Sequence, residues 1–245
     1  MPPMASHRLL LTNLALFVIG VAVALSQTSV QDYLFSRSPH ERLMNHFARF
    51  EKKMSREPEI RRALEGMTGS DLSANLQELS RRGTARLDDT TLLERARLMS
   101  AIYSRLSDRA CASIARGSLT ENGRAEFELT LLQLEVGFVS RWMECLHKAM
   151  LAEARQTPVH TVTRGELAAA FEALAQKIGE DATVRVDAGL NKGASDAELS
   201  WAERTVYAVA PTLPEPHGIA LLRMVTQEWE TADTTSILPL VPEVR

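Results

Sequence analysis

The sequence predicts an all-α protein: an irregular domain of about seven or eight helices after an N-terminal signal peptide or membrane anchor. Leu, Ala, Arg and Glu dominate over Val, Ile, Thr and Tyr, and apolar residues recur at helical spacing. Capping residues, Pro and Gly mark where the helical segments begin and end. The 245 residues are 45% apolar and 24% charged, which excludes collagen, low-complexity sequence and wholesale disorder.

The first 26 residues have the pattern of a signal peptide or signal anchor. His7 and Arg8 precede an apolar run over residues 9–25, and small residues permit cleavage after Ala24 or after Ser26. The run is also just long enough to span a membrane, so an uncleaved transmembrane helix is an alternative interpretation. A buried core helix of a cytosolic protein is another alternative. We expect this segment to engage the membrane or the export machinery. The predicted location is the cell envelope, either periplasmic or secreted after cleavage, or anchored in the inner membrane.

The remainder divides into three parts. Residues 27–36 are predicted to be a linker and residues 37–230 a single helical domain. The last residues, 231–245, contain two prolines and are predicted to form an extended or flexible tail.

Capping signals define the first helices of this domain. Ser38 and Glu41 form a capping box for a helix over residues 39–54. Short helices follow from Pro58 and from Ser70, and the second of these ends at a glycine, residue 83.

Two longer helices follow. Thr91 and Glu94 predict a capping box for a helix that continues to Gly117. A helix of about 30 residues then runs from the turn at residues 118–122 to Arg155, and its wide apolar face marks it as the central core helix.

The C-terminal part contains shorter helices. Thr163 with Glu166 and Ser195 with Glu198 predict two further capping boxes. Residues 179–193 between these helices are predicted to be a loop with a short strand-like run. A last helix carries Ile219, Leu222, Val225 and Trp229.

Local motifs for catalysis or metal binding are weak. Glu144 and His147 have the Glu-x-x-His spacing that ferritin-like di-metal sites use twice, but only one copy occurs. We expect Glu144 to pair instead with Lys148, four residues later on the same helix face. Zinc spacing, phosphate loops and serine-hydrolase motifs are missing from the sequence. We therefore predict no cofactor and no metal and name no catalytic residue, although a triad of distant residues stays open.

The two cysteines, Cys111 and Cys145, form a possible disulfide if the chain is exported. In a plain helical hairpin they would lie about 24 Å apart along the axis, so a bond requires a bend at Gly137 or crossing helices. Two separately buried thiols are the alternative.

Charge is distributed unevenly along the chain. Residues 27–124 contain 17 Lys/Arg and 13 Asp/Glu, whereas residues 125–245 contain 10 and 18. The basic part has no dense Lys/Arg block with aromatic residues, so nucleic-acid binding is not expected. Arginine outnumbers lysine by 23 to 5, which we attribute chiefly to base composition.

These observations favour a non-enzymatic envelope protein that binds another protein, as an inhibitor, an immunity-type protein or an assembly factor. The alternative is a helical enzyme or small-ligand-binding protein with a pocket built from scattered residues. Its candidate lining residues, for which core packing is the simpler explanation, are Trp142, Trp201, Trp229, Tyr103 and Tyr207.

Overall fold

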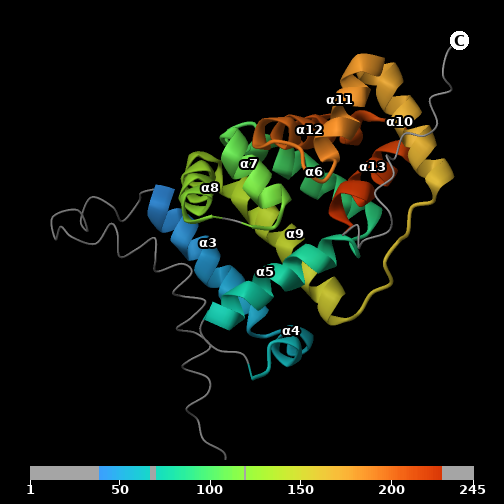
Figure 1. The fold of residues 1–245 in the computed structure, drawn as a ribbon. Coiled ribbons are helices and arrows are strands. Elements are labelled where there is room, and N and C mark those ends of the chain that lie inside the picture. Colours follow the sequence, from blue (N-terminus) through green and yellow to red (C-terminus); the bar gives the residue numbers. More distant parts are fainter. Residues whose placement is uncertain (1–38, 67–69, 119, 228–245) are drawn as a thin grey trace, which may run out of the picture. The chain divides into compact units, whose positions relative to one another are not determined.

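The computed structural model describes residues 39–66, 70–118 and 120–227 of the chain. Within these residues it contains eleven α-helices, one 3-10 helix and no strand (Figure 1), so the all-α prediction is confirmed. The predicted signal peptide or anchor, the linker and the C-terminal tail lie outside the described residues.

These residues form two compact units, and each combines two segments that are distant in sequence. Unit 1 contains residues 39–86 and Leu132–Thr157, and unit 2 contains Leu87–Leu131 and residues 158–227. The single domain expected over residues 37–230 stays a prediction.

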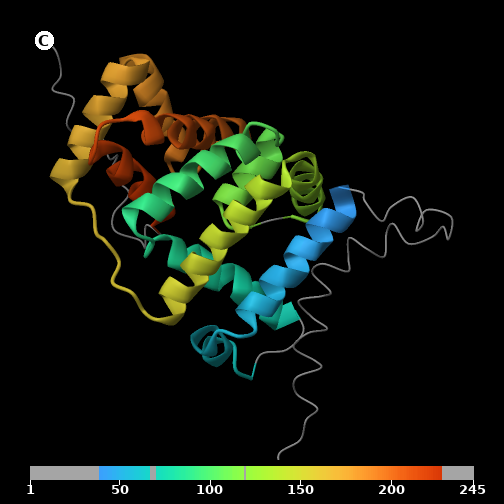
Figure 2. The same cartoon turned by 180° about the vertical axis from the view of Figure 1, so that it is seen from behind.

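Unit 1 is built around one long helix, α9 (Val136–Ala154). The helices α3 (Pro39–Met54), α4 (Pro58–Ala63) and α5 (Ser70–Thr84) each pack against it. Figure 2 shows α3 lying alongside α9. Their apolar faces enclose a core of Met54, Ile60, Leu64, Leu76 and Met150.

The closest approach in unit 1 occurs where α5 meets α9. A Cβ atom on Gly83 would lie 1.8 Å from the carbonyl oxygen of Ala149, which is far inside van der Waals contact. Glycine at this position therefore lets the two backbones touch. The predicted end of this helix at residue 83 thus coincides with a packing requirement.

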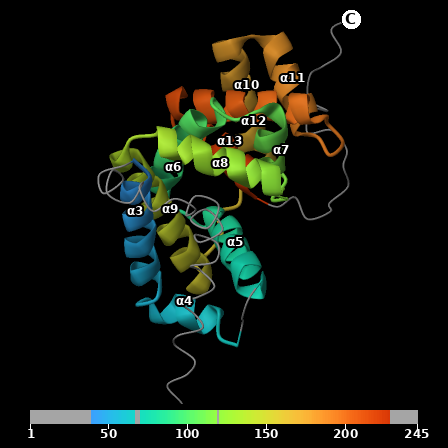
Figure 3. The same cartoon turned by 90° about the vertical axis from the view of Figure 1, so that its left-hand side faces the viewer.

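Unit 2 is arranged around α12 (Asp196–Val209), which packs against α6 (Asp89–Tyr103), α7 (Asp108–Ala115), α11 (Glu180–Leu190) and α13 (His217–Thr226). Figure 3 shows α10 (Arg164–Ile178) and α11 side by side as a hairpin. The 3-10 helix η1 (Ala210–Thr212) leads from α12 toward α13. The core of unit 2 contains fully buried aliphatic side chains from five helices: Leu92, Leu98, Ile102, Leu174, Val186, Val206, Leu221 and Leu222.

The expected helix over residues 91–117 is wrong in two respects. It begins earlier, because the Asp88 carboxylate accepts hydrogen bonds from the Thr91 amide and hydroxyl, both at 2.8 Å. It also divides into α6 and α7, because the Ser107 hydroxyl caps a new helix by accepting from the Ala110 amide.

The expected 30-residue helix also divides. It forms α8 (Glu121–Gln133) and α9, separated by two residues, of which Glu135 has an extended backbone. No side-chain cap accompanies this break. It lies close to Leu131, where the chain passes from unit 2 to unit 1.

The loop expected over residues 179–193 is mostly helical, since it contains α11. Thr183, Val186 and Asp187 are buried on one face at helical spacing, although Thr and Val favour strands. Gly189 fixes the packing of this helix, because a Cβ atom there would lie 2.6 Å from the Glu198 carbonyl oxygen.

Replacing Gly83 with alanine tests the close crossing of α5 and α9. We expect Gly83→Ala to lower the free energy of unfolding of unit 1 by roughly 1–3 kcal/mol, because the added methyl group must push backbone atoms apart. The matched control is Gly137→Ala, since a Cβ on Gly137 has no atom within 4 Å. Urea unfolding measures both variants; equal stability of the two would contradict the crossing.

Candidate functional site

A buried cluster of polar side chains lies in unit 2, between α6, α7 and α12. We call it the tyrosine cluster: Arg95, Tyr103, Cys111, Glu203 and Tyr207. Glu203 and Tyr207 lie one turn apart on the inner face of α12, and Arg95 and Tyr103 come from α6. All except Arg95 are buried, and the exposed fraction of Glu203 is only 6%.

The two tyrosines hold the cluster together by ring contact. The Tyr103 and Tyr207 rings meet edge to face, with centroids 5.3 Å apart and planes at 85°. The Arg95 guanidinium donates a hydrogen bond of 3.1 Å to the Tyr207 hydroxyl. Its central carbon also lies 5.9 Å from the centroid of the same ring. Tyr207 therefore has both polar and cation–π contact with one arginine.

Burial determines the ionisation of this cluster. It raises the pKa of Glu203 to about 7, against the attraction of Arg95, which lowers it. Burial also raises the pKa of Tyr103 and Tyr207. Near neutral pH the Glu203 carboxyl therefore exchanges between its neutral and ionised forms while both phenols stay protonated.

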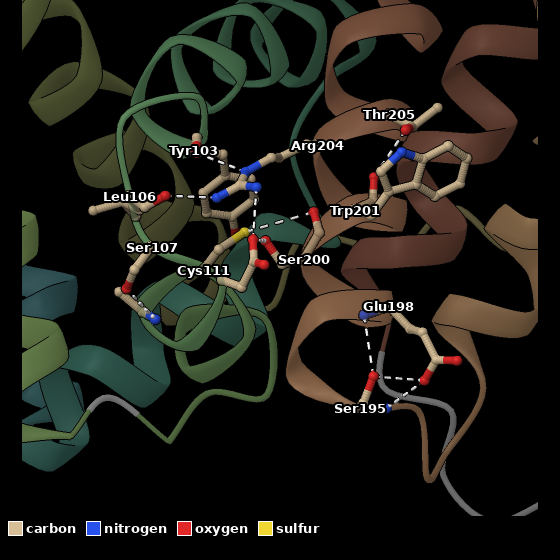
Figure 4. A network of polar contacts seen from close by, with 12 residues as sticks. Tyr103, Leu106, Ser107, Cys111, Ser195, Glu198, Ser200, Trp201, Arg204 and Thr205 are labelled. Carbon is tan, nitrogen blue, oxygen red and sulfur yellow. Dashed lines mark hydrogen bonds and ion pairs between the residues drawn. The ribbon is translucent and has the colours of Figure 1, made fainter.

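Arg204, beside the cluster, closes the gap between α6 and α7. Its guanidinium donates to the carbonyl oxygens of Tyr103, at 3.0 Å, and Leu106, at 2.5 Å, and pairs with Asp108 at 2.7 Å (Figure 4). The Ser200 hydroxyl donates to the same Asp108 oxygen at 3.0 Å. One arginine thus binds the last carbonyl of α6, a carbonyl of the connecting segment and the first residue of α7.

Cys111 is a buried, weakly acidic thiol. It is 0% exposed, and its sulfur lies 4.0 Å from the Ser200 carbonyl oxygen (dashed line in Figure 4). Burial raises its pKa to about 11, so it is not an activated nucleophile.

Cys145 is also buried, but it belongs to unit 1, whereas Cys111 belongs to unit 2. Neither cysteine is in a disulfide in the structure. The Cys111–Cys145 bond of the exported protein stays a prediction.

The Glu144 and His147 pair lies in unit 1. Glu144 accepts a 2.5 Å hydrogen bond from Lys53 on α3, a partner that helix spacing does not indicate, although Lys148 also lowers its pKa. His147 is buried, with its Nε2 atom 3.3 Å from Glu57, and burial lowers its pKa. Across the described residues, no three His, Cys, Asp or Glu side chains gather as metal ligands.

Four of the five candidate lining aromatics lie within the described residues. Tyr103 and Tyr207 meet in the tyrosine cluster, and Trp142 belongs to unit 1. Trp201 lies in unit 2 with its indole directed away from Cys111 (Figure 4). Trp229 lies outside the described residues.

Sequence reasoning did not identify Glu203 or Arg95. The signal for Glu203 was present, because it lies four residues after Leu199 and three before Val206, on the apolar line of its helix. A carboxylate at such a position is a buried polar group that needs a cation or a proton. Arg95 carries no comparable signal, because its pairing spans 112 residues.

Comparison with family models, with curated proteins and with solved structures gave no match to this chain. Among the helices of the described residues, none has both the length and the apolar character needed to cross a membrane.

Replacing Arg204 tests its role at the gap between α6 and α7. We expect Arg204→Ala to destabilise unit 2 by about 1–3 kcal/mol, because the Tyr103 and Leu106 carbonyls each lose a hydrogen bond and Asp108 loses its ion pair. Arg97→Ala, at an exposed position of α6, is the control and should change stability by less than about 0.5 kcal/mol. Hydrogen exchange across residues 104–110 measures the effect; equal exchange in both variants would contradict the role of Arg204.

Thiol reactivity tests the cysteines. In the native protein, we expect Cys111 to react with an alkylating reagent more than about 100-fold slower than a small thiol at pH 8, because it is buried and protonated. Intact mass after alkylation in denaturant, without reductant, then tests the predicted disulfide. Protection of both sulfurs until reduction supports it, whereas two immediate additions contradict it. Rapid modification of native Cys111 would contradict its burial.

Proposed function

We propose that this protein is a non-enzymatic helical protein of the cell envelope, exported or membrane-tethered, that binds another protein. The observation that carries the proposal is an arginine stacked on a tryptophan at the surface of unit 2. The Arg185 guanidinium carbon lies 4.0 Å from the centroid of the Trp201 ring. Val184 beside it is 54% exposed.

We call the residues Val184, Arg185, Glu198 and Trp201 the α11–α12 face. Tryptophan and arginine are the residue types that most often dominate binding energy at protein interfaces. The stack holds both long side chains in place before binding, which lowers the entropy lost when a partner arrives. The hydrogen bonds from Ser195 are the main cause that lowers the pKa of Glu198, and the nearby charge of Arg185 lowers it further.

The charge of unit 2 indicates what kind of partner suits it. Residues 87–131 and 158–227 contain 12 Lys/Arg and 16 Asp/Glu, a net charge of −4. Acidic residues begin both helices of the face: Glu180 and Asp181 in α11, and Asp196 and Glu198 in α12. A protein with a basic surface would be attracted during encounter, and an apolar side chain on it would contact Val184 and Trp201.

The envelope location rests on residues 1–26 and their signal-like pattern. The intact-mass measurement proposed for the cysteines also shows whether this segment is cleaved, since cleavage removes residues 1–24 or 1–26. The alternative of an enzyme or small-ligand carrier has less support, because two of its candidate lining residues, Tyr103 and Tyr207, pack against each other in the tyrosine cluster.

Photo-crosslinking in an expressing bacterium tests the proposal. A benzophenone amino acid replaces Val184, and in the control it replaces Glu172, which is exposed on α10 of the same unit. We expect residue 184, but not residue 172, to crosslink to one defined protein with a basic surface. Arg185→Ala should reduce the yield at least about 10-fold, because it removes the stacked cation.

Circular dichroism of Arg185→Ala must match that of the unmodified protein, so that a loss of crosslinking reports the face and not the fold. No crosslink at residue 184, or the same products at residues 184 and 172, would contradict protein binding at this face.

A further inference from the structure

The strongest unexplained feature of the described chain is the buried carboxyl group of Glu203. A glutamate on the inner face of a core helix costs stability unless it is neutral or fully paired. Tyr103, Tyr207 and Cys111 of the tyrosine cluster are all less than 4% exposed. Burial is the main cause that raises the pKa of each of these groups, and the charge of Glu203 is a further cause for all three. Glu203 therefore lies where the gain or loss of one proton changes the packing energy.

Arg95 is the cation that acts on this carboxyl group, and it has a second role. Its guanidinium donates to the Tyr207 hydroxyl and lies over the Tyr207 ring. Glu203 and Tyr207 are one turn apart, so an ionised carboxylate and the phenol compete for the same guanidinium. A neutral carboxyl leaves Arg95 on Tyr207.

Two other buried or half-buried arginines of unit 2 bind groups outside the tyrosine cluster or at its edge. Arg204 is held by Asp108 and by the carbonyls at the end of α6. Arg223 on α13 donates to the Leu87 carbonyl and Asp89. The other charged and titratable groups on α12 and on the helices packed against it are Asp89, Glu94, Arg95, Arg97 and Tyr103 on α6, Asp108, Arg109 and Cys111 on α7, Glu180, Asp181, Arg185 and Asp187 on α11, Asp196, Glu198, Arg204 and Tyr207 on α12, and His217 and Arg223 on α13.

We propose that Glu203 is a proton-operated latch between α12 and α6. With the carboxyl group protonated, Arg95 stays on Tyr207 and α12 packs fully against α6. When the proton leaves, a negative charge is buried in the cluster, Arg95 is drawn toward it, and α12 opens more readily to solvent.

The sign of the pH effect follows from the ionisation of Glu203. Its pKa is raised from 4.5 to about 7 in the folded protein, so the folded state keeps a proton that the unfolded state releases. The contribution of Glu203 to the stability of unit 2 is therefore greatest below pH 4.5, and it is lost as the pH rises through about 7. Between pH 5 and pH 8.5 the opening equilibrium of α12 should increase roughly 50- to 100-fold.

Hydrogen exchange of the full chain tests the latch. We expect protection of α12 amides, corrected for intrinsic exchange rates, to fall by that factor between pH 5 and pH 8.5. In Glu203→Gln, which resembles the neutral carboxyl group, most of this dependence should disappear. Glu172→Gln is the matched control at an exposed position, and it should keep the full dependence.

A second variant keeps the test sharp if Glu203→Gln folds poorly. Arg95→Gln removes the charge that lowers the pKa of Glu203, so the midpoint of the pH dependence should move upward. Two results would overturn the latch: protection of α12 independent of pH in the unmodified chain, or a midpoint that stays fixed in Arg95→Gln.

The latch also reaches the proposed binding face, since α12 carries Glu203 inside and Trp201 outside. This extension rests on the proposed function: crosslinking from residue 184 should weaken between pH 6 and pH 8.5 in the unmodified chain but not in Glu203→Gln. The exchange measurement needs no partner. Its failure would overturn the latch alone, whereas a lack of crosslinks at every pH would overturn the proposed function alone.

Discussion

A Cβ atom on residue 83 would lie 1.8 Å from the carbonyl oxygen of Ala149, so α5 and α9 can cross as they do only with glycine there. The same constraint recurs in unit 2. Gly189 brings α11 against the backbone of α12, and Gly218 brings α13 against the Ala210 carbonyl. Helices of six to nineteen residues bury little surface individually. Close contact between the helix backbones lets these helices share a densely packed core.

Short helices also have many backbone carbonyl groups near their ends without a hydrogen-bond donor in the helix. Arginine side chains donate to several of these carbonyl groups. Arg204 binds two carbonyls at the end of α6, and Arg223 binds the Leu87 carbonyl just before α6 begins. In unit 1, Arg86 pairs with Glu153 at 2.5 Å and donates to the Thr157 carbonyl, closing the end of α9. A planar guanidinium reaches several acceptors at once, which a lysine ammonium does less well. The arginine excess, which base composition explains in the sequence, therefore has a structural use at these positions.

The sequence was most informative where structure is local. The capping boxes at Thr163 and at Ser195 are both present, because each depends on residues three apart. It was least informative where a break depends on a distant partner. Ser107 lies inside the helix predicted to continue to Gly117, and the Arg204 side chain that binds the Leu106 carbonyl at the break is 98 residues away along the chain. The run at residues 183–186 was assigned by β-propensity, although its buried positions follow a helical period. Of the candidate site, the tyrosines were named but Arg95 and Glu203 were not. Glu203 lies on the apolar line of its helix and could have been found, whereas Arg95 pairs with a residue 112 positions away and could not.

The two faces of α12 explain why a buried carboxyl group bears on an exposed surface. On its inner face, Ser200 contacts α7 and Tyr207 contacts α6, and Glu203 is buried between them, while Trp201 on the other side lies under Arg185 from α11. Gly189 and Ala202 hold α11 and α12 in close contact, so α11 follows α12 when that helix shifts. A helix of fourteen residues has no spare turn to absorb such a shift between its two faces. In the proposed latch, the Arg185–Trp201 stack therefore keeps its own geometry, and the ionisation of Glu203 changes where the α11–α12 face lies relative to α6 and α7.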